Sequence, residues 1–128
     1  MQDSLLEIRD LKTFFFTEAG VVKAVDGASV DVRSKETIGL IGESGSGKTV
    51  TALSALRIIP RPGRIVAGSI QFEGIDVLAK TEEEMRQLRG PKMAMVFQDP
   101  SSSLNPLYTV EKQLSDILML HRKLSKTE

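Results

Sequence analysis

Residues 42–49 read Gly-Glu-Ser-Gly-Ser-Gly-Lys-Thr, and this octet restricts the possible folds of the chain more than any other feature. Its glycines permit backbone dihedrals that are closed to residues with a Cβ, so that successive N–H groups can turn inward. The apolar segment 37–41 precedes the octet, and residues 50–59 follow it with apolar side chains at helical spacing up to Pro60. A buried strand, a glycine-rich turn and a helix in this order predict an α/β fold with an anion-binding concavity at the helix N-terminus.

The residue types of the octet indicate a nucleoside triphosphate with Mg²⁺ as the ligand of that concavity. Lys48 supplies a mobile positive charge that reaches the β- and γ-phosphates, and Thr49 supplies a hydroxyl, which is a hard oxygen ligand for Mg²⁺. The predicted nucleotide-binding residues are therefore Gly42, Glu43, Ser44, Gly45, Ser46, Gly47, Lys48 and Thr49. The alternative is a glycine-rich turn with an exposed lysine, and the order of strand, loop and helix favours the phosphate-binding loop.

The composition excludes several classes of protein. The chain has 17 basic and 17 acidic residues, and this balance argues against a nucleic-acid binder, which needs a basic surface. It has no cysteine, which excludes disulfides and thiolate metal sites and suits a reducing cytosol. The N-terminus lacks the features of a secretory signal, and no stretch approaches the ~20 apolar residues of a membrane span. We therefore expect no direct insertion into a membrane.

The residues on either side of the octet predict an antiparallel β layer. Polar and apolar residues alternate over 5–11 and again over 23–32, and residues 18–20 supply turn chemistry between them. Residues 69–72 alternate in the same way, after a connection at 63–68 that is flanked by glycine and proline. These patterns predict an N-terminal antiparallel β-subdomain.

The second half of the chain predicts two helices and one further strand. The capping-box spacing at 81–84 predicts a helix through Leu88 that ends before Gly90 and Pro91. The apolar residues 93–97 predict a second buried strand, and the apolar positions from Val110 to Leu124 predict an amphipathic helix. His121 is a lone histidine on the apolar stripe of that helix, so we interpret it as a packing residue rather than a metal ligand.

Three motifs identify a family resemblance: the octet, Leu-Arg-Gly at 88–90, and Met-Val-Phe-Gln-Asp-Pro-Ser-Ser-Ser-Leu-Asn-Pro at 95–106. With them the sequence resembles the N-terminal part of the ATP-binding subunit of ABC transporters, most closely the dipeptide/oligopeptide (and nickel) importer branch. The resemblance covers essentially all 128 residues. It implies an α/β P-loop NTPase (ABC-ATPase) core that is incomplete and carries an N-terminal antiparallel β-subdomain.

The resemblance also assigns roles outside the octet. It implies that Gln98 is the Q-loop glutamine, which approaches Mg²⁺ and the attacking water, and that Phe15 is the aromatic residue that stacks on adenine. Phe14 and Phe16 flank Phe15, so this assignment can shift by one position, and a strand with rings on both faces is the other interpretation. Lys35 stands where the family usually has glycine.

The family's signature motif, its Walker B strand ending in Asp-Glu, its D-loop and its switch histidine do not occur in these 128 residues. We therefore interpret the chain as the N-terminal part of a nucleotide-binding domain, which holds half of an ATP site and does not hydrolyse ATP by itself. No catalytic residue is assigned. The resemblance implies ATP and Mg²⁺ as cofactors, peptides as cargo, and membrane-spanning subunits and a second ATP-binding subunit as partners on the inner face of the cell membrane.

Two other functions are open at the level of sequence. The apolar run that ends at Asp99 can be interpreted as a Walker B strand, which would make the chain a self-contained P-loop NTPase or kinase with Asp99 at the metal. The residues after Asp99 argue instead for a turn. The other alternative is a non-catalytic remnant that binds nucleotide weakly or not at all.

Overall fold

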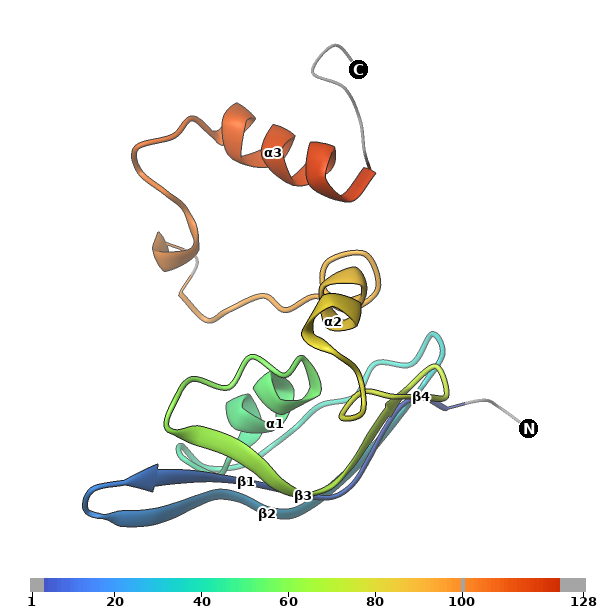
Figure 1. The fold of residues 1–128 in the computed structure, drawn as a ribbon, viewed down its shortest axis with the longest axis vertical. Coiled ribbons are helices and arrows are strands. Elements are labelled where there is room, and N and C mark those ends of the chain that lie inside the picture. The colour runs from blue at the N-terminus through green and yellow to red at the C-terminus, as the bar shows by residue number, and fades with distance from the viewer. Residues whose placement is uncertain (1–3, 100, 123–128) are drawn as a thin grey trace. The chain divides into compact units, whose positions relative to one another are not determined.

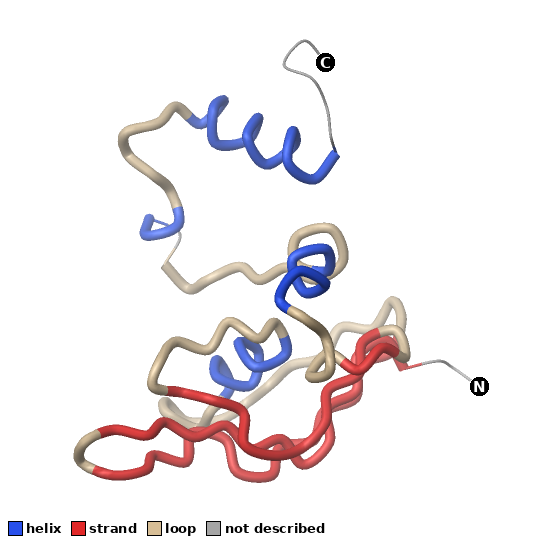
Figure 2. Tube along the Cα trace, in the orientation of Figure 1, coloured by secondary structure: helices blue, strands red, loops and turns tan. Residues whose placement is uncertain are grey.

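The computed structural model describes residues 4–99 and 101–122. The chain divides into two compact units, Met1–Met85 and Arg86–Glu128. The first unit contains the phosphate-binding octet and every buried apolar side chain of the described residues. Figures 1 and 2 show the course of the chain through both units.

A four-stranded antiparallel sheet of order β2-β1-β3-β4 forms the base of the first unit (Figure 2). Its strands are β1 (Ser4–Thr17), β2 (Gly20–Arg33), β3 (Gly63–Phe72) and β4 (Ile75–Asp76). β1 and β2 form a hairpin whose tight turn pairs Thr17 with Gly20. The two predicted N-terminal strands and their turn are thus confirmed, and both strands are longer than predicted because the hairpin ladder continues to their ends.

The prediction of a connection at residues 63–68 was wrong, because these residues form the first half of β3. Gly63 pairs with Phe15 of β1, and Ile65 pairs with Thr13. Glycine has a low strand propensity, but propensity is a weak determinant where a neighbouring strand supplies a ladder of hydrogen bonds. The local sequence does not reveal that neighbour.

An irregularity in β1 decides which of its side chains are buried. Between Ile8 and Leu11 the pairing with β2 shifts register, and Asp10 adopts a φ of 46°. Such a bulge adds a residue to one strand and reverses the alternation of faces beyond it. Ile8, Leu11 and Thr13 are consequently all buried, although strict alternation would place Ile8 and Leu11 on opposite faces.

Helix α1 (Lys48–Ala55) lies over one face of this sheet (Figure 1). The side chains that it buries are small or polar and include Thr51, Ser54 and Ala55. Leu53, one of the apolar residues at helical spacing in residues 50–59, is only half-buried. Small residues let the helix axis approach the strands closely.

The predicted extension of α1 to residue 59 was wrong, because the helix closes at Ala55 with a left-handed turn. Arg57 has a φ of 53°, its N–H donates to the Ser54 carbonyl at 3.0 Å, and the N–H of Ile58 donates to the Leu53 carbonyl at 3.0 Å. These two bonds define a Schellman motif, which satisfies the last carbonyls of a helix. The side chain of Arg57 stabilises the turn further by donating to the carbonyls of Val77 and Lys80 at 3.0 and 2.5 Å.

Neither predicted parallel strand forms among the described residues. Residues 37–41 have no ladder partner there and leave Ile41 fully exposed, and residues 93–97 take part only in an isolated bridge between Arg89 and Met93. A parallel strand exists only through hydrogen bonds to its neighbours, and apolar content alone does not supply them. Both segments were therefore incorrectly predicted as strands.

The predicted helices of the second half are confirmed as α2 (Glu82–Leu88) and α3 (Val110–Arg122). Between them a short 3₁₀ turn spans Ser101–Ser103. The predicted end of α3 at Leu124 lies outside the described residues. His121, which we interpreted as a packing residue, is exposed, and its imidazole lies against Gly90.

Candidate nucleotide-binding site

The phosphate-binding octet forms an exposed loop that leads directly into α1. Gly45 and Gly47 have φ values of 80° and 92°, in the left-handed region that residues with a Cβ rarely adopt. The N–H of Ser46 donates to the Glu43 carbonyl at 3.2 Å and closes a turn over Ser44 and Gly45. The glycine positions of the pattern thus coincide with the conformations that require them.

Lys48 folds back across this loop. Its Nζ donates to the carbonyls of Gly42 and Glu43 at 2.8 and 2.7 Å and to the Ser46 hydroxyl at 3.1 Å. A lysine ammonium has three N–H donors, and these three contacts use all of them. The two carbonyl contacts are the shorter ones, and the contact with the Ser46 hydroxyl is the longest of the three.

The N-terminus of α1 is open. Gly47 occupies the position before the helix, so no side chain of the described residues caps it, and the first turn contains no acidic residue. The first N–H groups of a helix have no partner within the helix and carry the positive end of its dipole. Thr49 is exposed in this first turn. The helix therefore presents unpaired donors and a hydroxyl at the end of the loop, which is the donor set of an anion and metal site.

Strand β2 lies close against the loop at Gly47. An added Cβ at Gly47 would run into the backbone carbonyl oxygen of Ala24 and would lie 3.3 Å from Cγ2 of Val25. At Gly42 it would meet the Ser46 hydroxyl at 2.5 Å. Glycine is therefore required at position 47 for two reasons, which are the positive φ and the close approach of the loop to β2. The sequence pattern gave no indication of Ala24 or Val25.

The structure separates the three consecutive phenylalanines of β1 by face. The Phe15 ring lies against Gly63, where an added Cβ would meet its edge at 2.7 Å. Phe14 lies beside the ammonium of Lys23, and Phe16 stacks on the guanidinium of Arg64 at 4.0 Å. Since residues two apart in a strand share a face, Phe15 lies on the face of the buried Thr13, and its two neighbours lie on the other. The role of Phe15 at adenine stays a prediction.

The structure describes Gln98 and Asp99 in the second unit. Gln98 is exposed, and its role at Mg²⁺ stays a prediction. The Asp99 carboxylate accepts hydrogen bonds from the hydroxyl and the N–H of Ser101 at 2.5 and 3.0 Å, and these bonds hold its pKa below its usual value. Asp99 thus initiates the 3₁₀ turn, as the turn interpretation predicts. No group of three or more acidic, histidine or cysteine side chains that could hold a metal ion occurs in residues 4–99 and 101–122.

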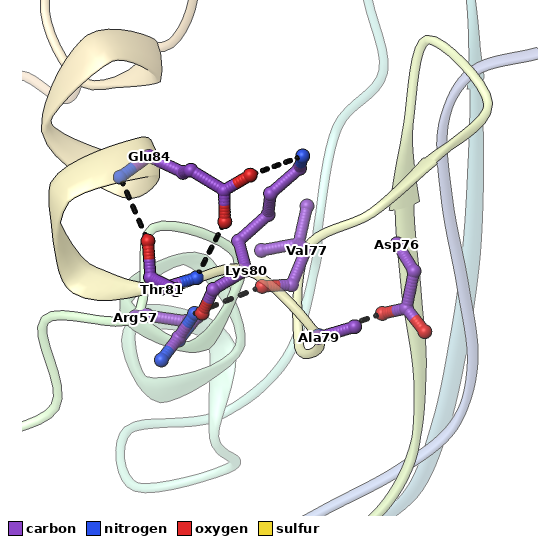
Figure 3. A network of polar contacts seen from close by, with 7 residues as sticks. All are labelled: Arg57, Asp76, Val77, Ala79, Lys80, Thr81 and Glu84. Atoms are coloured by element: carbon purple, nitrogen blue, oxygen red, sulfur yellow. Dashed lines mark hydrogen bonds and ion pairs between the residues drawn. The ribbon is translucent and has the colours of Figure 1, made fainter.

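A polar network links the end of α1 to the start of α2 (Figure 3). The N–H of Glu84 donates to the Thr81 hydroxyl at 3.2 Å, and the Glu84 carboxylate accepts from the Thr81 N–H at 2.8 Å, which confirms the predicted capping box. Lys80 donates to the same carboxylate at 2.9 Å. These bonds lower the pKa of Glu84 to about 2, and the bond from Lys80 has the largest effect. Arg57, which closes α1, donates to the Lys80 carbonyl in this network.

The loop, the uncapped helix and the lysine together have the arrangement of a P-loop, which is the defining element of the P-loop NTPase class. A sequence profile of the ABC transporter family matches residues 25–128, and the chain belongs to this family. The incomplete α/β ABC-ATPase fold with an antiparallel β-subdomain, predicted from the sequence, is therefore confirmed. No helix of the described residues is long and apolar enough to cross a membrane.

Curated relatives at high identity carry names of peptide transporters. The chain is 43% identical over 127 residues to a probable peptide ABC transporter ATP-binding protein of Sinorhizobium fredii, and these residues are 98% of the chain and 38% of the relative. It is 44% identical over 126 residues to the oligopeptide transport ATP-binding protein OppD of Escherichia coli, with 98% of the chain and 37% of that protein covered. The oligopeptide transport ATP-binding protein AppD of Bacillus subtilis is 40% identical over 126 residues, with 98% of the chain and 38% of that protein covered. The chain therefore spans less than two-fifths of the length of these relatives.

Proposed function

We propose that this chain binds ATP with Mg²⁺ through residues 42–49 and belongs to an ATPase that energises peptide uptake. The observation that carries the proposal is the arrangement of Lys48 at the mouth of a glycine loop in front of an uncapped helix. Membership of the ABC transporter family and relatives named as peptide transport ATP-binding proteins support the same function.

The residues of the loop fit a triphosphate. The open N–H groups of α1 and the turn at Gly45 and Gly47 would surround phosphate oxygens, and Lys48 would exchange its contact with the Ser46 hydroxyl for a phosphate oxygen while its carbonyl contacts hold it in place. Thr49 would offer its exposed hydroxyl to Mg²⁺. The bound nucleotide and metal supply the phosphoryl chemistry of the family, and these residues orient them.

The proposal also gives roles to Phe15 and Gln98. Phe15 would stack on adenine, a role that the separation of Phe15 from Phe14 and Phe16 by face supports. Gln98 would approach Mg²⁺ and the attacking water through its neutral amide, in agreement with its exposed position in the Q-loop motif. Residues 4–99 and 101–122 contain no cluster of acidic residues at which we would place a second metal.

We place the protein in a membrane complex. Its partners would be membrane-spanning subunits and a second ATP-binding subunit on the inner face of the cell membrane, and its cargo would be dipeptides or oligopeptides. The names of the relatives support the class of cargo. For the 128-residue chain itself we propose nucleotide binding without turnover, since its sequence contains neither the signature motif nor a Walker B Asp-Glu pair.

Isothermal titration of the chain with Mg·ATP tests the proposal, with phosphate release followed in the same samples. Lys48→Ala should weaken binding by roughly 100-fold, because the charge-assisted contact to a phosphate oxygen and the attraction of the ammonium to the triphosphate are both lost. Lys112→Ala removes an equal charge from the exposed face of α3 and should leave the affinity unchanged. Equal ATP affinity in the Lys48→Ala variant and the parent chain would contradict the site, and phosphate release by the parent chain would contradict binding without turnover.

A further inference from the structure

A buried pair of hydroxyl groups joins α1 to β1. Thr13 Oγ1 and Ser54 Oγ are 2.8 Å apart, and both residues are fully buried. The Ser54 hydroxyl donates its proton to the Val50 carbonyl at 2.7 Å, so the proton between the two hydroxyls comes from Thr13. This contact between side chains lies in the core of the first unit, where a hydrogen bond with a defined geometry permits one alignment of the two elements.

Each member of the pair is connected to a different part of the proposed nucleotide site. Ser54 lies on α1, whose N-terminus receives the phosphate loop, and the helix is a rigid element of eight residues. Thr13 lies two residues before Phe15 in β1, on the same face of the strand, and both residues pair with β3 in regular register at Ile65 and Gly63. A displacement of α1 along β1 would therefore move the loop relative to the Phe15 ring.

We propose that Thr13 and Ser54 are positioning residues for nucleotide binding, because their hydrogen bond fixes the distance between the phosphate loop and the strand that presents Phe15. This inference rests on the proposed function, since it requires a ligand that contacts both places. According to this inference, the hydroxyl pair aligns the part of the site that contacts the base with the part that contacts the phosphates. A ligand that contacts only the loop does not depend on this alignment.

The test compares ATP with inorganic tripolyphosphate, which offers the phosphates without a base. In Thr13→Val, which keeps the shape of the side chain and removes the hydroxyl, ATP affinity should fall roughly 3- to 10-fold, the range set by one neutral hydrogen bond. Tripolyphosphate affinity should stay within about 2-fold of the parent chain. Thr13→Ser retains the hydroxyl and should restore ATP binding. Ser54→Ala removes the α1 partner of the same hydrogen bond, and it replaces Thr13→Val in the test if that variant does not fold.

Two controls separate positioning from stability. Ile70→Val removes one methyl group from the buried core of β3 without touching the hydroxyl pair, so it destabilises the fold and should leave the ratio of ATP to tripolyphosphate affinity unchanged. In a Phe15→Ala background the Thr13→Val substitution should have little further effect on ATP, because the pair acts through Phe15.

The outcomes distinguish this inference from the proposed function. If the parent chain binds neither ligand, the proposed function fails and the inference fails with it. If the parent chain binds ATP, and Thr13→Val either binds it equally well or weakens ATP and tripolyphosphate by the same factor, the inference is overturned and the proposed function stands.

Discussion

Replacing Gly47 with alanine tests how the phosphate loop is supported, and Gly45→Ala is its matched control. Both glycines lie in the same exposed loop with similar positive φ, so both substitutions carry the same backbone cost of about 1 kcal/mol or slightly more. At Gly45 an added Cβ meets nothing within 4 Å, whereas at Gly47 it meets the Ala24 carbonyl of β2. Relief of that clash requires a shift of the loop or of β2, which costs a further ~1–3 kcal/mol.

The expected loss in unfolding free energy is therefore about 1 kcal/mol for Gly45→Ala and about 2–4 kcal/mol for Gly47→Ala. Both substitutions reduce the entropy of the unfolded chain by the same amount, so this contribution cancels in the comparison. Urea unfolding followed by circular dichroism measures both values. Equal losses for the two variants would refute the conclusion that the loop rests on β2 through Gly47.

Three further predictions concern the capping network, the end of α1 and the Q-loop. Lowering the pH from about 5 toward 2 should reduce the stability of the parent chain. The pKa of Glu84 is about 2 in the folded chain, which is below its value in the unfolded chain. The stabilisation of the fold by the Glu84 carboxylate is therefore present above the unfolded pKa and is lost as the pH falls through the folded pKa. Glu84→Gln should flatten this part of the pH profile of the urea midpoint, and an unchanged slope would contradict it. Arg57→Ala should cost about 1–3 kcal/mol in urea unfolding, since the carbonyls of Val77 and Lys80 lose their donor; a loss below about 0.5 kcal/mol would show that water replaces the guanidinium. Gln98→Ala should reduce ATP affinity in titration calorimetry less than Lys48→Ala does, and equal reductions would contradict the role given to the glutamine.

The sequence predicted those features that depend on local chemistry. The glycine positions of residues 42–49, the hairpin turn before Gly20 and the capping box of Thr81 and Glu84 each follow from the dihedral or hydrogen-bonding capacity of a few consecutive residues. The motifs that carried the family resemblance are equally local, and the family match confirms the resemblance. Such features need no knowledge of what lies opposite in the fold.

The features that were not predicted depend on partners distant in the sequence. Strand β3 begins at Gly63 because β1 lies beside it, and α1 ends early because Arg57 finds acceptors 20 and 23 residues further along the chain. The same reason explains the incorrect prediction at residues 37–41, where an apolar run has no ladder partner among the described residues. The pair of Thr13 and Ser54 joins residues 41 positions apart, and neither residue type indicates burial by itself.

The most direct test of the proposed site is an NMR titration of the ¹⁵N-labelled chain with Mg·ATP. The structure predicts that the largest amide shifts occur in the loop and first turn of α1, above all at Gly45, Gly47, Lys48 and Thr49, where the N–H groups face the proposed phosphates. A smaller set of shifts should appear around Phe15. No change at millimolar Mg·ATP, or changes confined to residues outside the loop and β1, would contradict nucleotide binding at this site.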